Sequence, residues 1–172
     1  MEVSIMSELK EISISELKFN PWEKISKEWF LITSGDESGF NTMTASWGFM
    51  GEMWGRNVMQ TVVRHNRYTF EFMEKNDLFT VSFLPAERKD ALKFCGANSG
   101  RSCDKAKEAG LTPVFLDGTT AFEEAELVFV CKKLYSGDFD LEKLPTEEKE
   151  KWYAKDPVHR QYFGEILKVY SK

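Results

Sequence analysis

Residues 41–47, which read NTMTASW, carry several hydroxyl groups that could bind a ligand. Side chains alternate between the two faces of a strand, so Thr42, Thr44 and Ser46 would share one face. Hydroxyls donate and accept hydrogen bonds and can therefore bind a phosphate or ring oxygens. The opposite face would pack through Met43, Ala45 and Trp47. An edge strand whose hydroxyls simply face water explains the same pattern, so both interpretations stay open.

A second cluster, residues 64–69, lies where an apolar run meets a helical pattern. Arg64 and Arg67 carry guanidinium groups whose paired N–H donors suit phosphate oxygens, and Thr69 adds a hydroxyl. The start of a helix also presents free N–H groups and a positive dipole end to anions. The cluster therefore fits a phosphate site, although two arginines at the start of a helix are also common on protein surfaces.

A third cluster, residues 94–105, contains Gly96 and Gly100, and glycine lets a backbone approach a ligand closely. A polar loop between two short helices gives the same pattern. Cys95 could be a redox thiol, but a small buried residue at the end of a helix is the more common role of such a cysteine. The sequence shows no nucleophile with a partner base, so we assign no catalytic residue.

The length and composition of the chain exclude several classes of protein. The length of 172 residues predicts one domain, residues 1–172. A formal net charge of -5 argues against general nucleic-acid binding, which depends on a basic surface. Three cysteines without a C-x-x-C spacing and two histidines offer no metal-ligand set or disulfide framework. Without a secretory signal or a membrane-spanning run of roughly 20 apolar residues, we expect a cytoplasmic protein.

Short strands and short helices must position the three clusters. Apolar and alternating runs predict strands over residues 12–17, 29–33, 41–50, 58–63, 78–84, 125–135 and 162–169. Helical spacing predicts helices over residues 65–75, 87–94, 102–109 and 141–154, and the glycine-rich residues 48–55 predict a hairpin connection or an open loop. The helices do not alternate strictly with the strands, and no G-x-G-x-x-G follows a strand. We therefore expect a mainly β, mostly antiparallel barrel with peripheral helices.

Several of these segments resemble one known family. The string NTMTASW at residues 41–47 resembles the cofactor-binding strand of the flavin reductase-like family of FMN-binding split barrels. Residues 99–101 with Asp104 and Lys105 resemble the SGRD…DK region of that family, and residues 159–166 resemble its closing segment, a His followed by a Gly-Glu-Ile/Val strand. Order and spacing agree from about Trp29 to Val169.

The resemblance implies an antiparallel split β-barrel that binds FMN, and only the resemblance favours FMN over FAD. It also implies a set of ligand residues. The flavin would be lined by Thr42, Met43, Thr44 and Ala45, with Ser46 and Trp47 close by. The phosphate would be bound by Arg64, Arg67 and Thr69, and the loop side of the ring would be bordered by Phe94, Cys95, Ser99, Gly100 and Lys105.

The chain departs from the family pattern in two places. Many members carry a Pro-Pro pair after the first motif, where this chain reads GEMWGR over residues 51–56. A differently shaped loop is therefore expected over the flavin face. Residue 102 is serine where the SGRD string has aspartate, so Arg101 is left out of the ligand set.

The implied activity is that of an NAD(P)H-dependent oxidoreductase, in which FMN accepts hydride from NADH or NADPH and passes electrons to a flavin or another small acceptor. A flavoredoxin-like electron carrier, reduced by a partner protein, would bind the same cofactor and stays open. A non-redox domain without the cofactor is the third alternative, supported only by residues 51–56. The family is usually dimeric, so the resemblance implies a homodimer with FMN near the interface.

Overall fold

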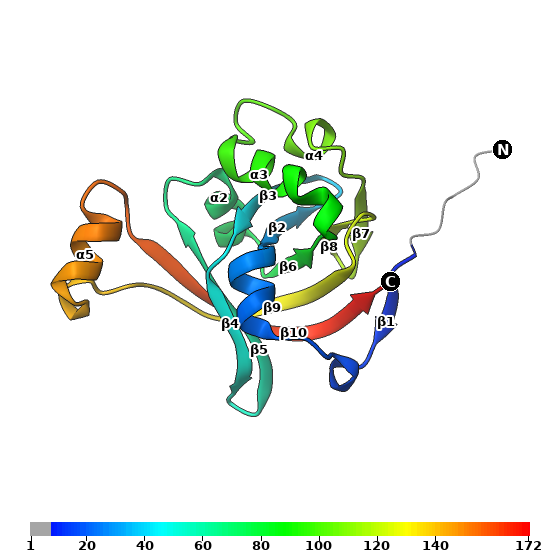
Figure 1. Ribbon diagram of the computed structural model, residues 1–172, viewed down its shortest axis with the longest axis horizontal. Coiled ribbons are helices and arrows are strands. Elements are labelled where there is room, and N and C mark those ends of the chain that lie inside the picture. Colours follow the sequence, from blue (N-terminus) through cyan, green and yellow to red (C-terminus); the bar gives the residue numbers. More distant parts are fainter. Residues whose placement is uncertain (1–7) are drawn as a thin grey trace.

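The computed structural model describes residues 8–172, and its centre is an eight-stranded antiparallel sheet (Figure 1). The strands follow the order β3-β2-β6-β9-β10-β5-β4, and β1 pairs with β10 beside this path. Although β3 and β4 are consecutive in the sequence, they lie at opposite ends of the order. The sheet is therefore open between them, as in a split barrel, which confirms the predicted fold class.

The main strands are β1 (Lys10–Ile12), β2 (Phe30–Asp36), β3 (Gly39–Ala45), β4 (Gly48–Met53), β5 (Arg56–Arg64), β6 (Leu78–Phe83), β9 (Leu127–Asp138) and β10 (His159–Ser171). A separate hairpin pairs β7 (Pro113–Leu116) with β8 (Thr119–Phe122). The helices are α1 (Pro21–Glu23), α2 (Tyr68–Lys75), α3 (Lys89–Ala97), α4 (Lys105–Glu108) and α5 (Thr146–Tyr153). Shorter helical turns occupy Ile14–Glu16, Lys24–Glu28, Ala86–Arg88 and Leu141–Lys143.

Helices cover the sheet unevenly. In Figure 1, α2, α3 and α4 lie near β3, whereas α5 projects from the ends of β9 and β10. Within the described residues, no helix is long and apolar enough to cross a membrane.

Two apolar cores hold the sheet together. Inside the barrel, Phe83 packs against Phe30 and Phe129, with ring centroids 5.5 and 6.2 Å apart. The second core joins the outer side of the sheet to α3, α4 and the β7–β8 hairpin, and includes the buried Leu92 and Phe122. Burial of this apolar surface fixes α3 and α4 beside β3.

A tight hairpin sets the register of β3 on β2. Thr33 pairs with Thr42 across the two strands. In the turn, Asp36 Oδ1 accepts hydrogen bonds from the backbone N–H and the hydroxyl of Ser38, at 2.9 and 2.6 Å. Gly35 has φ 108°, and a Cβ there would lie 2.2 Å from a backbone oxygen, so only glycine fits. A slip by one residue would turn every side chain of β3 to the other face.

Most predicted elements are confirmed. Strands β2, β5, β6, β9 and β10 and helices α2 to α5 overlap the predicted segments, although β2, β9 and α3 end about three residues later than predicted and β10 begins earlier, at His159. The strand predicted over residues 41–50 is interrupted between Ala45 and Gly48. The connection or open loop predicted over residues 48–55 is wrong for residues 48–53, which form β4 and pair with β5 in a hairpin. Helix α1 and the β7–β8 hairpin were not anticipated.

The strand predicted over residues 12–17 is wrong. β1 ends at Ile12, and the chain then forms the short helical turn Ile14–Glu16. Ser13 Oγ accepts a hydrogen bond from the N–H of Ser15, and the Glu16 carboxylate accepts one from the N–H of Ser13. This reciprocal capping box starts a helix, and it outweighs the alternating pattern of the segment.

Gly164 in β10 provides a test of the packing. A Cβ there would lie 2.5 Å from Phe79 Cζ and 2.8 Å from Cys131 Cβ. We expect Gly164→Ala to lower the free energy of unfolding by about 1–3 kcal/mol, the usual cost of overpacking a core, as measured by urea denaturation. Gly51→Ala in β4 is the matched control, because a Cβ there meets nothing within 4 Å. Equal stabilities of the two variants would contradict this packing.

Candidate anion-binding site

Four cavities follow β3 from its start to the link that leads to β4. The terminal pocket, about 400 Å³, lies beside Gly39 to Thr42, and the anion pocket, about 110 Å³, lies over Met43. The central pocket, about 420 Å³, lies beside Thr44 to Ser46, and the apolar pocket, about 370 Å³, beside Ser46 to Met50. Neighbouring pockets share lining residues, so an elongated ligand could lie along the strand.

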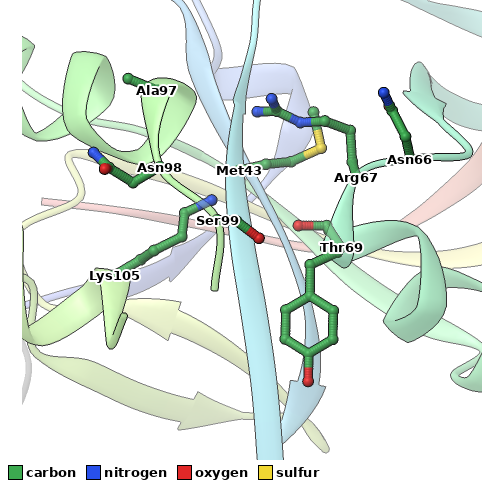
Figure 2. A pocket seen from close by; sticks show the side chains of 9 residues that line it. Met43, Asn66, Arg67, Thr69, Ala97, Asn98, Ser99 and Lys105 are labelled. Atoms are coloured by element: carbon green, nitrogen blue, oxygen red, sulfur yellow. The ribbon is translucent and has the colours of Figure 1, made fainter. Parts of the chain in front are cut away.

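The anion pocket lies between the start of α2 and the loop that joins α3 to α4. Figure 2 shows Arg67 and Thr69 on one side of Met43 and Ser99 and Lys105 on the other. The remaining lining residues are Asn66, Tyr68, Ala97 and Asn98. Both charged side chains in the lining are cations, so the pocket favours an anion.

Lys105 is the most unusual group in this pocket. Its side chain is only 5% exposed, and no hydrogen bond or ion pair to it is present within residues 8–172. Burial, opposed by Cys95 and aided by the nearby charge of Arg67, lowers the pKa of its ammonium to about 8. A buried charge without a partner is costly, which points to a ligand that supplies the opposite charge.

Arg67 supplies the second cation. Its Nη2 donates to the carbonyl oxygen of Gly96 at 3.1 Å, and this bond holds the side chain across the gap between α2 and α3. Burial lowers the pKa of its guanidinium, and the neighbouring charge of Arg64 adds to this. Arg67 is also the N-cap residue of α2, where the described residues place no side-chain cap. The first N–H groups of that helix are therefore available to an anion.

Gly100 lines the terminal pocket and lies close against β3. The amide of Asn41 donates to Thr69 Oγ1 at 2.7 Å and so joins β3 to α2. A Cβ on Gly100 would lie 1.9 Å from Asn41 Oδ1 and 3.0 Å from Tyr68. Glycine at this position therefore lets the loop approach the strand closely, whereas the sequence analysis expected a close approach to a ligand.

The hydroxyl row of β3 is mostly engaged within the protein. Thr42 Oγ1 shares a hydrogen bond of 2.8 Å with Thr33 Oγ1, and Thr44 Oγ1 donates to Leu92 O at 2.5 Å. Thr42 is buried, so it does not face water as the simpler interpretation required. Ser46 lies at the end of the row and lines both the central and the apolar pocket.

Arg64 lies apart from the anion pocket. Its guanidinium donates to the backbone oxygens of Pro157 and Trp152, at 2.7 and 3.1 Å, and lies over the ring of Tyr153. It therefore anchors the segment that carries α5. Its charge still reaches the site, because it lowers the pKa of Arg67.

The other predicted residues fall into two groups. Met43, Ala45, Ser99 and Trp47 line pockets along β3. Phe94 and Cys95 lie in α3 outside the linings of these pockets, and burial raises the pKa of the Cys95 thiol to about 11. A thiol with this pKa is protonated at neutral pH, which favours the packing role of Cys95 over a redox role.

Sequence reasoning missed four residues of the anion pocket, Asn66, Tyr68, Ala97 and Asn98. Each lies next to a predicted ligand-binding residue or within one of the three clusters. Adjacency in the sequence was therefore the available signal, because a turn that presents one side chain to a ligand often presents its neighbours as well.

The chain belongs to a known family. The family model for the flavin reductase like domain matches residues 22–170, which places the chain in that family. A comparison with curated protein sequences finds no match.

Three solved structures share the fold. An FMN-binding domain of a flavin reductase-like enzyme from Shewanella baltica is 12% identical, with 96% of this chain and 78% of that chain covered and a TM-score of 0.68. Flavoredoxin from Methanosarcina acetivorans is 20% identical, with 95% and 76% covered and a TM-score of 0.68. An NADH:FAD oxidoreductase from Streptomyces globisporus is 15% identical, with 84% and 75% covered and a TM-score of 0.63.

Burial of Lys105 makes the stability of the ligand-free protein depend on pH. An unfolded lysine keeps its proton up to a pKa near 10.5, whereas folded Lys105 loses it near 8. Between these values the unfolded chain binds more protons, so stability rises with pH. We expect Lys105→Met to be more stable than the parent at pH 7, and this advantage to shrink between pH 8 and 10.5.

Urea denaturation of flavin-free protein across this pH range measures the effect. Lys107→Met is the control, because Lys107 is an exposed lysine of the same helix. Parallel pH curves for Lys105→Met and the parent would contradict the burial of this ammonium group.

Proposed function

We propose that this chain binds FMN along β3 and acts as an oxidoreductase that takes hydride from NADH or NADPH. The observation that carries the proposal is the buried ammonium of Lys105, without a partner in the described part of the chain and next to Arg67. Retention of such a charge is explained by an anion that binds there. Membership of the flavin reductase like family, with solved relatives described as FMN-binding, supports the FMN phosphate as this anion.

In this proposal the anion pocket holds the phosphate. Arg67 and Lys105 donate charge-assisted hydrogen bonds to its oxygens, and the free N–H groups at the start of α2 add to them. Ser99 and Thr69 contribute hydroxyls. The residue types present fit a phosphate.

The central pocket would hold the flavin ring. It shares Arg67 and Ala97 with the anion pocket, and its volume falls within the usual range for cofactor sites. A Cβ on Gly96 would lie 3.4 Å from Thr44 Cβ, so glycine keeps the space between α3 and β3 open. When bound, FMN supplies hydride acceptance and electron transfer, while the chain positions the ring and shields it from water.

The apolar pocket lies where the electron donor or acceptor would approach. It shares Ser46 with the central pocket, and Trp22, Trp47 and Phe49 contribute aromatic surface. Among the described residues, its lining contains no charged side chain. Such a surface suits the flat ring of a nicotinamide or of a second flavin.

A flavoredoxin-like electron carrier is the second candidate. The β4–β5 hairpin exposes Phe49, Met53 and Trp54, with 61, 42 and 61% of their surfaces accessible. Exposed apolar patches of this kind often mark protein interfaces, so a protein donor could dock here. The same patch could equally serve the predicted homodimer, which stays a prediction together with the cytoplasmic location.

The visible spectrum of the purified protein tests the proposal. FMN is added first, followed by NADH and then NADPH under anaerobic conditions. Bound flavin that bleaches with either nicotinamide supports the reductase and identifies its donor. Bound flavin that bleaches only with a protein donor favours the carrier, and protein that binds no flavin would overturn both.

Removal of either cation should weaken FMN binding. We expect Arg67→Gln and Lys105→Met each to raise the dissociation constant of FMN by about 10- to 100-fold, because each removes a charge-assisted hydrogen bond. Quenching of flavin fluorescence on binding measures the constant. Lys107→Met removes an equal charge outside the pocket lining and is the control. An FMN affinity unchanged in both pocket variants would place the phosphate elsewhere.

The charge of Lys105 also predicts a pH dependence of binding. Since the pKa of the ligand-free ammonium is about 8, FMN affinity should fall as the pH rises through 8 to 10. The decrease should be absent in Lys105→Met. An equally steep decrease in that variant would assign it to another group.

A further inference from the structure

Lys105 lies between two cavities. It lines both the anion pocket and the terminal pocket, and Tyr68 is the other residue common to the two linings. In Figure 2 the nitrogen of Lys105 points toward β3, with Arg67 across the strand. A small molecule whose anionic end is bound beside Arg67 would therefore have its other end next to the Lys105 nitrogen or in the terminal pocket.

The side chain of Lys105 has the properties of a nucleophile. It is buried, and among residues 8–172 no carboxylate or hydrogen-bond acceptor engages it. Burial and the nearby charge of Arg67 lower its pKa from the ordinary 10.5 to about 8, although Cys95 and Cys103 oppose the shift. At pH 8 about half of the Lys105 side chains are then neutral amines, compared with roughly 0.3% of exposed lysines. Only the neutral amine has a free electron pair for attack on a carbonyl carbon.

We propose that Lys105 is a site of acylation by acyl phosphates, the mixed anhydrides of a carboxylic acid and phosphoric acid. The anion pocket would bind the phosphate through Arg67, Thr69 and the free N–H groups at the start of α2. The acyl group would then lie beside Lys105, on the side of the terminal pocket. This arrangement holds the carbonyl carbon next to the amine, which is the main requirement for a fast reaction between them.

The lining of the terminal pocket favours this orientation of the ligand. Phe40 and Phe72 provide apolar surface for an acyl group. Glu37 and Asp104 contribute carboxylates to the same lining, and these would repel a phosphate. The phosphate is therefore directed to the cations of the anion pocket, and the acyl group to the opposite side of Lys105.

The reaction needs no reactant besides the acyl phosphate. The electron pair of Lys105 Nζ forms a bond to the carbonyl carbon, and the bond from that carbon to the phosphate oxygen breaks. Inorganic phosphate leaves beside Arg67, whose charge stabilises it, and the nitrogen loses one proton to water. An uncharged amide remains at residue 105.

Acylation of Lys105 would regulate the binding of FMN. This consequence rests on the proposed function, whereas the acylation itself does not. The amide carries no charge for a phosphate, so we expect the dissociation constant of FMN to rise about 10- to 100-fold, as in Lys105→Met. Bound FMN would occupy the anion pocket and should in turn prevent the acylation.

Peptide mass spectrometry of flavin-free protein treated with acetyl phosphate at pH 8 tests the proposal. Lys107 is the internal control, because it is an exposed lysine of the same helix. The neutral fraction of Lys105 is more than about 100-fold larger, but a less basic amine is also roughly tenfold less nucleophilic. We therefore expect Lys105 to be acetylated at least about tenfold faster than Lys107. Equal rates at the two lysines would overturn the proposal.

Acetic anhydride separates a phosphate-directed reaction from the general reactivity of this amine. It carries the same acetyl group without a phosphate, so Arg67 cannot position it. The preference for Lys105 over Lys107 should be at least about tenfold greater with acetyl phosphate than with the anhydride. Equal preferences with the two reagents would overturn the proposal. An acetyl thioester at Cys103, which hydroxylamine cleaves, in place of the amide at Lys105 would also overturn it, because Cys103 lines the terminal pocket too.

Arg67→Gln removes the main phosphate contact and leaves the amine in place. We expect it to slow acetylation of Lys105 by acetyl phosphate about tenfold or more, with a smaller effect on the reaction with the anhydride. An equal effect on both reactions would overturn the proposal, because the phosphate would then have no part in the selectivity.

Protection by ligands separates this proposal from the proposed function. Inorganic phosphate and FMN, each at about ten times its dissociation constant, should slow acetylation of Lys105 about tenfold and leave Lys107 unaffected, because roughly one protein in eleven stays free. Protection by phosphate without protection by FMN would support the acylation site and refute the proposed binding of FMN. Absence of protection by inorganic phosphate would overturn the acylation proposal itself.

Discussion

The ammonium group of Lys105 is buried beside the guanidinium of Arg67, where desolvation and repulsion both oppose its charge. The backbone that carries Lys105 is held on both sides. Asp104 caps α4 by accepting the N–H of Lys107, and the adjacent Ala106 is buried in the second core. The energy released by packing α4 against the sheet can thus offset the cost of a charge in this position. In the proposed site, an anion would meet two cations that the fold has already positioned, so less ordering would oppose its binding.

The opening of the sheet explains why this arrangement lies over β3. An end strand has one edge free of strand partners, and proteins usually protect such an edge with other elements. Here α2, α3 and the loop before α4 cover it incompletely, and the spaces left between them are the pockets along the strand. The split between β3 and β4 therefore creates the site as well as shaping the barrel.

The proposed site is built from side chains that are far apart in the sequence. Arg67 lies at the start of α2 and Lys105 at the start of α4, and the strand between them in space, β3, precedes both in the chain. The Asn41–Thr69 hydrogen bond and the close approach of Gly100 to Asn41 fix these three segments together. Small changes in the loop around Gly100 would thus alter the distance between the two cations.

Local sequence signals determined much of this structure. The hydrophobic patterns of β5, β6 and β9 locate the core strands, and the arginine and threonine at residues 67 and 69 predict an anion site at the start of α2. The alternation of apolar and polar residues gave a wrong strand at residues 12–17, where a capping box starts a helical turn instead. The hydrophobic pattern also missed the β7–β8 hairpin, whose pairing is stabilised by burial against the sheet.

Tertiary structure alone decided which predicted groups are free to bind. Sequence spacing could place Thr42 and Thr44 on one face, but only packing shows that Thr33 and the Leu92 carbonyl already engage their hydroxyls. Likewise, Arg64 and Arg67 are equivalent in the sequence, yet one anchors the α5 segment and the other lines the anion pocket. The sequence by itself determined the residue types and the strands that carry them. The tertiary structure decided which groups each polar side chain contacts, because hydrogen-bonding groups and opposite charges must lie close together in space, whatever their separation in the sequence.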